Sequence, residues 1–139
     1  MDVHDPKTRS YNMSRIKGKD TKPELLVRKY LFAQGLRYRL HVKNLPGKPD
    51  LVFPKYKTVL FINGCFWHGH KGCRYFTLPK TNTEWWLQKI KGTQRRDKEA
   101  EIALNVAGWK VITVWECELK PDNREETLQR LVEGILKQD

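Results

Sequence analysis

Residues 64–73 concentrate two cysteines and two histidines among three glycines. A third cysteine, Cys117, follows the apolar run 109–115. A loop so rich in glycine and polar groups has little apolar surface of its own, so a metal ion would supply the missing rigidity. Cys65, Cys73, Cys117 and one of His68 or His70 would complete a tetrahedral Cys3His zinc site. Three unrelated thiols and two surface histidines are the alternative, but the short spacing between Cys65 and Cys73 favours zinc.

The cysteine count also limits the cellular setting. Three cysteines are an odd number, and no secretion signal accompanies them, so a disulfide framework is not expected. A reducing cytoplasm and a role in metal binding fit this cysteine content better. The expected localisation is therefore cytoplasmic, close to the bacterial nucleoid if the partner is DNA.

The charge balance predicts a polyanionic partner. Lysine and arginine number 27 against 16 aspartates and glutamates, a net charge of +11 on 139 residues. An anionic membrane would attract such a chain, but it has no long apolar run and no amphipathic basic helix. Nucleic acid is the favoured partner, because each phosphate contact releases condensed counterions. Residues 1–20 are predicted to be a basic arm that contacts the DNA backbone, with a solvated tail as the alternative; its cationic residues are Lys7, Arg9, Arg15, Lys17 and Lys19.

The periodicity of apolar residues predicts one α/β domain over residues 21–139, in the order helix, three strands, helix, strand, helix. We expect helices over about 21–35, 84–107 and 123–137, and strands over about 38–42, 51–53, 58–62 and 109–115. Thr83 is the expected cap of the second helix, and Gly92 is a candidate break within it. The apolar faces expected for the first and last helices comprise Leu26, Tyr30, Leu31, Ala33, Leu128, Leu131, Ile135 and Leu136.

Acidic and histidine side chains outside the metal set are candidates for catalysis. A structural zinc site needs only one imidazole here, so the second histidine of the loop could act as a general base near neutral pH. Asp50 opens an apolar strand after a proline-rich turn, where a carboxylate can bind Mg²⁺, although an ordinary turn aspartate is the alternative. A helix capping box accounts for Glu24 from sequence alone, and a helix-surface charge pair accounts for Asp97.

Two aromatic pairs, Phe66-Trp67 and Trp85-Trp86, have two interpretations. Burial in the core is the usual fate of tryptophan. Phe66 and Trp67 lie within the glycine-rich loop, however, which is an unusual place for core residues. The competing interpretation is an aromatic wedge between base pairs, which costs least at a defective pair.

At this point the motifs resemble a known family. The segment Gly64-Cys65-Phe66-Trp67-His68 resembles the signature of the very-short-patch repair (Vsr) endonucleases. Further similar segments are Arg9-Ser10, Met13, Ile16, Asp20-Thr21 and Glu24, then Leu45-Pro46-Gly47-Lys48-Pro49-Asp50, Thr83-Glu84-Trp85-Trp86, Gly108-Trp109 and Val114-Trp115-Glu116-Cys117. The resemblance runs from about residue 3 to about residue 118. It implies a restriction-endonuclease-like fold with a mixed central sheet flanked by helices, and a nickase that cuts on the 5′ side of the thymine in a T:G mismatch.

The resemblance also implies residue roles. Asp50 and the carbonyl of Ile62 correspond to Mg²⁺ ligands, His68 to the catalytic histidine, Glu24 to a carboxylate that organises the hydrated metal, and Asp97 to a nearby supporting residue. The implied zinc ligands are Cys65, His70, Cys73 and Cys117, and the implied intercalating residues are Phe66, Trp67 and Trp86. Double-stranded DNA with a T:G mismatch is the implied partner, mismatch-repair proteins are candidate partners, and a monomer is expected.

Three positions depart from the best-known pattern of this family. Ile62 replaces a threonine, Asn63 replaces a histidine opposite Asp97, and His70 and Cys73 are one residue further apart. Two other classes of function remain open: a zinc module that binds DNA without cutting it, and a restriction-type enzyme that cuts both strands as a dimer. A toxin-like ribonuclease is less favoured, because no RNA-specific motif is present.

Overall fold

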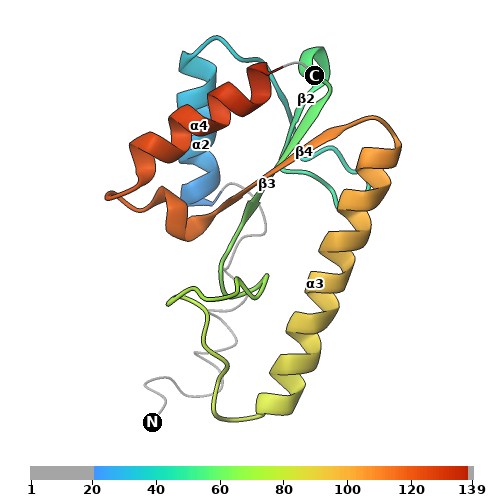
Figure 1. Cartoon of the computed structure of the whole chain (residues 1–139), viewed down its shortest axis with the longest axis vertical. Coiled ribbons are helices and arrows are strands. Elements are labelled where there is room, and N and C mark those ends of the chain that lie inside the picture. The colour runs from blue at the N-terminus through green and yellow to red at the C-terminus, as the bar shows by residue number, and fades with distance from the viewer. Residues whose placement is uncertain (1–20, 138–139) are drawn as a thin grey trace.

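The computed structural model describes residues 21–137, which form three helices around one four-stranded sheet (Figure 1). The elements are α2 (Lys22–Ala33), β1 (Arg39–Leu40), β2 (Leu51–Phe53), the 3-10 turn η1 (Pro54–Tyr56), β3 (Thr58–Asn63), α3 (Thr83–Val106), β4 (Lys110–Trp115), the 3-10 turn η2 (Glu116–Leu119) and α4 (Arg124–Leu136). The predicted α/β class and order of elements are confirmed. The basic arm over 1–20 lies outside the described residues, so its five cations stay predictions.

The sheet is mixed, as predicted. Its strand order is β1-β2-β3-β4; β1 to β3 form an antiparallel meander, and β4 runs parallel to β3. Parallel neighbours need a long crossover connection. Residues 64–109 supply it, first as the cysteine- and histidine-containing loop and then as α3. This topology places the ends of β3 and β4 side by side, with Asn63 paired with Trp115.

The core has two parts, one on each face of the sheet. Alternate residues of a strand point to opposite faces, so Leu51 and Phe53 contribute to one part and Val52 to the other. The larger part lies beneath α2 and α4, and the smaller part contains Leu104 of α3 (Figure 1). The sheet is therefore covered on both sides, which accounts for the nearly continuous apolar character of β2 and β3.

Several local expectations were wrong. Helix α3 is continuous through Gly92, since one internal glycine costs a helix only about 1 kcal/mol. Its N-cap is Asn82 rather than Thr83, because the Thr83 hydroxyl lies 2.8 Å from the Pro79 carbonyl and donates to it instead. Strand β1 is shorter than expected and exposed on both residues. Leu136, expected on the apolar side of α4, is 46% exposed.

The buried face of α2 also differs from the expected one. Its buried residues are Glu24, Val27 and Leu31, whereas Leu26 and Tyr30 lie at the margin of the core. Of the expected apolar residues only Leu31 is fully buried, Ala33 is exposed, and the acidic Glu24 points inward with Val27 and Leu31. Thr21 does cap the helix, since its hydroxyl accepts the Glu24 N–H at 3.4 Å. The capping-box explanation of the Glu24 side chain does not account for its burial, because that carboxylate contacts His41 and Arg28.

Candidate functional site

Asp50 is fixed between two strands. Its N–H donates to the carbonyl of Leu60 at 3.1 Å, and its Oδ2 accepts the N–H of Ile62 at 2.7 Å. The carboxylate is therefore held beside the end of β3. Burial raises its pKa from 3.8 to about 6; the Ile62 N–H opposes this increase, and the Glu24 charge adds to it. A partly buried carboxylate with a raised pKa is a group that a bound cation would stabilise.

Three of the four predicted catalytic residues lie together in one cavity, and the fourth, Asp97, contacts one of them from outside it. Asp50, Glu24 and His68 line a space of about 450 Å³ that also reaches Trp67. The remaining lining residues are Thr21, Pro23, Ile62, Asn63, Gly64 and Glu116. Residues as far apart in the sequence as Thr21 and Glu116 thus share one concave site. A carboxylate and an imidazole at one cavity could act on the same substrate atom.

His68 is oriented by a carboxylate on α3. Its Nδ1 lies 2.6 Å from Oδ2 of Asp97, and its backbone N–H donates to the Gly64 carbonyl at 3.2 Å. An ionised carboxylate only accepts, so Nδ1 is the donor in this contact, and in a neutral ring Nε2 would hold the lone pair that can take a proton. The family resemblance predicts that Asp97 lies opposite Asn63. In the structure the Asp97 carboxylate instead pairs with His68. This is the geometry of a histidine base with an orienting acid.

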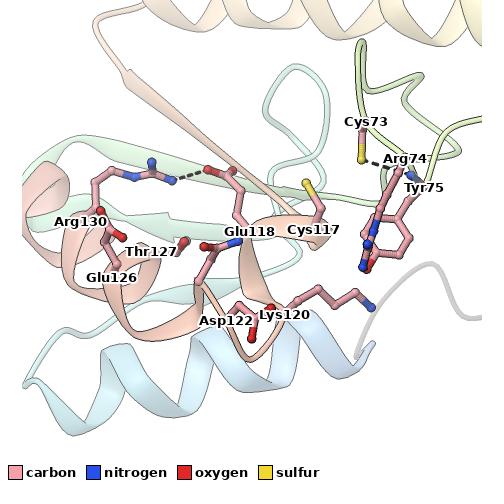
Figure 2. A pocket seen from close by; sticks show the side chains of 11 residues that line it. Cys73, Arg74, Tyr75, Cys117, Glu118, Lys120, Asp122, Glu126, Thr127 and Arg130 are labelled. Atoms are coloured by element: carbon pink, nitrogen blue, oxygen red, sulfur yellow. Dashed lines mark hydrogen bonds and ion pairs between the residues drawn. The ribbon is translucent and has the colours of Figure 1, made fainter.

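A second group of side chains forms a compact cluster. One donor atom from each of Cys65, His70, Cys73 and Cys117 lies within 4.8 Å of the other three, and Cys117 Sγ is 3.4 Å from His70 Nδ1. Figure 2 shows Cys73 and Cys117 approaching each other from the loop and from η2. A tetrahedral zinc ion would require ligand separations of roughly 3.5–3.8 Å, given bonds of about 2.1–2.3 Å. The donor set is one that zinc prefers, and the distance between Cys117 and His70 is already close to this separation. The extra residue before Cys73 does not keep it out of the cluster.

The loop reaches this arrangement through tight turns and close packing. The His70 N–H donates to the Cys65 carbonyl at 2.9 Å, and the His70 ring stacks on Trp115 with centroids 4.0 Å apart. Gly69 has φ +59°, and a Cβ there would lie 2.5 Å from Ile90 of α3. Only glycine fits this close contact with the helix. Burial raises the pKa of the Cys65 thiol to about 12, so its thiolate form needs a cation beside it.

The aromatic residues of the loop and of α3 also meet. Ring centroids are 5.2 Å apart for Phe66 and Trp67, 5.4 Å for Phe66 and Trp86, and 6.0 Å for Trp67 and Trp86. Trp67 is 36% exposed, and Trp85, whose ring contacts Trp86, is 57% exposed. The cluster is therefore partly open to solvent at the edge of the Asp50 cavity, unlike a closed core.

Comparison with known proteins agrees with this geometry. The family model described as DNA mismatch endonuclease Vsr matches residues 1–74. The type II nicking enzyme V.NmeAIP of Neisseria meningitidis is 52% identical over 96% of this chain and 96% of its own length. The DNA mismatch endonuclease Vsr of Escherichia coli is 43% identical over 96% of this chain and 87% of its own length. This chain belongs to the Vsr family of DNA mismatch endonucleases.

Family membership confirms three predictions made from the sequence: the family itself, a DNA endonuclease activity, and DNA as the substrate. A third Vsr-like relative, the type II nicking enzyme V.XorIIP of Xanthomonas oryzae, is 50% identical over 82% of this chain and 83% of its own length. A noncatalytic DNA-binding module is thereby disfavoured. Among residues 21–137, no helix has the length and apolar character needed to cross a membrane.

Two residues at this Vsr site were missed by sequence reasoning. Glu116, directly before Cys117, lines the Asp50 cavity as a third carboxylate. His41 contacts Glu24 through its side chain and Asp50 through its backbone. Glu116 could have been found from its place at the end of β4, next to the end of β3. His41 could have been found only from the register of β1 against β2, which places it opposite Asp50.

Proposed function

We propose that this endonuclease nicks the thymine-containing strand on the 5′ side of the thymine in a T:G mismatch, by Mg²⁺-dependent hydrolysis. The observation that carries the proposal is the shared cavity of Asp50, Glu24 and His68. Carboxylate and carbonyl oxygens are the ligands that Mg²⁺ prefers, and an imidazole nearby can accept a proton. A cut leaving a 5′ phosphate and a 3′ hydroxyl would suit repair synthesis of deaminated 5-methylcytosine.

Asp50 and the Ile62 carbonyl are the proposed Mg²⁺ ligands. When bound, the metal supplies Lewis acidity at the scissile phosphate and stabilises the departing 3′ oxygen. His68 accepts the proton of the attacking water at Nε2, while Asp97 holds the ring and stabilises its charged form. Glu24 orients water molecules around the metal. Replacing threonine by Ile62 leaves this scheme intact, since the main chain provides the ligand atom.

The proposed role of Cys65, His70, Cys73 and Cys117 is to hold a structural Zn²⁺. All four positions of a tetrahedral ion would be filled by protein atoms, leaving none for substrate. Such an ion joins the loop to the end of β4, and the loop also carries His68. Its function is therefore to keep His68 facing the Asp50 cavity.

The aromatic cluster is the proposed means of finding the mismatch. Phe66, Trp67 and Trp86 form a contiguous, partly exposed group whose rings could enter the base stack. Unstacking costs a few kcal/mol per step and least at a mispaired base, which would favour T:G over T:A. We further propose that the basic residues of 1–20 bind the DNA backbone, that residues 21–139 act as one nuclease domain, and that the enzyme works as a monomer.

The decisive experiment compares short duplexes holding T:G or T:A, labelled on each strand, with and without Mg²⁺. We expect Mg²⁺-dependent cutting of the thymine strand alone, 5′ of the thymine, in the T:G duplex. Asp50→Ala should lower the single-turnover rate roughly a thousandfold or more, because the metal contributes several kcal/mol of charge stabilisation. Asp122→Ala, which removes an exposed aspartate lining a different pocket, is the matched control.

Each alternative predicts a distinct result. Cuts in both strands would identify a restriction-type enzyme. Binding without cutting would identify a DNA-binding module. Near-normal cutting by Asp50→Ala would remove that residue from the mechanism.

A further inference from the structure

His41 contacts two of the three carboxylate residues of the cavity, Glu24 and Asp50, although it does not line the cavity itself. Its Nε2 lies 2.8 Å from Oε2 of Glu24. Its backbone N–H donates to the Asp50 carbonyl at 3.2 Å, one step beyond the pairing of Leu40 with Leu51. The residue has φ +49°, a left-handed conformation that costs a non-glycine residue free energy. This conformation turns the chain out of β1 while the ring contacts α2.

The Glu24 carboxylate is buried and therefore depends on its partners. Its side chain is only 3% exposed, and Oε2 receives both His41 Nε2 and Nη1 of Arg28, the latter at 3.2 Å. A buried charge is costly unless it is paired and hydrogen-bonded. Within residues 21–137, these partners of Glu24 differ in attachment: Arg28 lies on the same helix as Glu24, whereas His41 follows β1 and is bonded to Asp50 across the sheet. His41 therefore fixes Glu24 relative to Asp50, which Arg28 cannot do.

Glu24 and Asp50 also line the same cavity. A change in the position of Glu24 would therefore alter the surroundings in which Asp50 binds a cation.

We propose that His41 is a positioning residue for DNA nicking, which holds the Glu24 carboxylate at the distance from Asp50 that the hydrated metal requires. This inference rests on the proposed Mg²⁺-dependent nicking. The competing explanation is that His41 only joins β1 to α2 and so stabilises the fold. The two explanations differ in what a substitution changes: the metal-dependent rate in the first, and the stability of the protein in the second.

The structure allows substitutions that separate these explanations. Glutamine can place its amide nitrogen near the position of the His41 Nε2, so His41→Gln keeps the donor to Glu24. Asparagine places its amide nitrogen near Nδ1, so His41→Asn keeps polarity and tolerates the left-handed backbone but does not reach Glu24. His41→Leu removes the donor altogether. All three variants keep the backbone N–H that binds Asp50.

We would measure single-turnover nicking of the T:G duplex across Mg²⁺ concentrations, together with duplex affinity without Mg²⁺ and the unfolding temperature. For His41→Asn and His41→Leu we expect about tenfold lower maximal rates and a higher Mg²⁺ concentration at half-maximal rate, because residues that orient metal ligands typically contribute 10- to 100-fold. His41→Gln should retain a rate within about twofold of the wild type. Duplex affinity should be the same for all four proteins.

The possible failures are distinguishable. If the wild type does not nick the T:G duplex in Mg²⁺, the proposed function fails and this inference fails with it. If the wild type nicks but His41→Asn matches it at every Mg²⁺ concentration, only the inference is overturned. Equal losses of rate in the asparagine and glutamine variants, or losses that follow the unfolding temperature, would likewise assign His41 to fold stability alone.

Discussion

The cysteine cluster and the Asp50 cavity lie at the same end of the sheet, but the cluster is closed by protein atoms and the cavity is open. The cluster brings four protein donor atoms within 4.8 Å of one another. The cavity leaves about 450 Å³ open around Asp50, Glu24 and His68. A metal site filled by protein atoms can only stabilise structure, whereas a site with open positions can bind a phosphate. Under the proposed function, the cluster would hold the metal that supports the fold and the cavity the metal that supports the chemistry.

The two regions share their supporting segments. In the loop after β3, Cys65 and His70 belong to the cluster, while Trp67 and His68 line the cavity. In η2, Glu116 lines the cavity and the next residue, Cys117, belongs to the cluster. Rigidity gained in the cluster is thus transmitted to the cavity over one or two residues. The division of roles can be tested by substituting residues in one region and measuring zinc content, stability and nicking rate.

The largest effect is expected from breaking the cluster. Cys117→Ser should lose stoichiometric zinc and on the order of 5 kcal/mol or more of unfolding free energy, since structural zinc contributes roughly 10 kcal/mol in small domains. Metal analysis and chemical denaturation would measure both. Asp50→Ala is the matched control and should retain one zinc per chain. Zinc loss in Asp50→Ala, or full zinc content in Cys117→Ser, would contradict the separation of the two sites.

A second prediction concerns the carboxylate that orients His68. Asp97→Asn should lower the single-turnover nicking rate about 100-fold, because a general base contributes 10²- to 10⁴-fold and Asp97 fixes its orientation and charge. Zinc content and unfolding temperature should stay close to those of the wild type. Glu101→Gln removes another acidic side chain of α3 and should leave the rate nearly unchanged. Equal effects of the two substitutions would indicate that the negative charge of acidic residues on α3, and not the contact with His68, affects the rate.

The third prediction uses the raised pKa of Asp50. Because the folded protein raises this pKa to about 6, Asp50 stabilises the fold only when protonated, and that contribution is lost as pH rises from 3.8 through 6. Without Mg²⁺, Asp50→Asn should therefore be more stable than the wild type by up to about 3 kcal/mol at pH 8, falling to about half that at pH 5. Chemical denaturation at both pH values would measure the difference. Asp122→Asn should show no such pH dependence, and a constant difference for Asp50→Asn would contradict the argument.

Sequence patterns predicted the features that depend on residues close together in the chain: the helices, the strands and the cysteine-containing loop. Apolar periodicity gave the element order, and the turn before Asp50 placed it at the start of β2. The cysteine spacing predicted a Cys3His cluster, although the spacing alone did not decide between His68 and His70. The family resemblance made that choice, and the structure places His70 in the cluster. These predictions succeeded because helix, strand and loop preferences act over a few residues.

Contacts between distant segments were predicted less well. Glu24 has a sufficient local explanation as a capping residue, yet it is buried against His41, seventeen positions away. Asp97 looks like half of a surface charge pair in the sequence, but its carboxylate holds His68 across twenty-nine positions. Both contacts depend on how α2 and α3 pack on the sheet. A periodicity argument carries no information about that packing, so it also missed His41 and Glu116.

The smallest effect is expected at the aromatic cluster, and it tests whether the open region also recognises the substrate. Trp67→Ala should reduce the preference for T:G over T:A duplexes about tenfold, since stacking of one base on an aromatic ring contributes roughly 1–3 kcal/mol. Competition binding and nicking rates on both duplexes would measure this preference. Trp85→Ala removes a more exposed ring of the same cluster, which lies 4.9 Å from Trp86 but outside the Asp50 cavity, and should affect both duplexes alike. If Trp67→Ala also weakened both duplexes equally, this ring would contribute only to packing or general affinity, and mismatch recognition would have to come from Phe66 or Trp86.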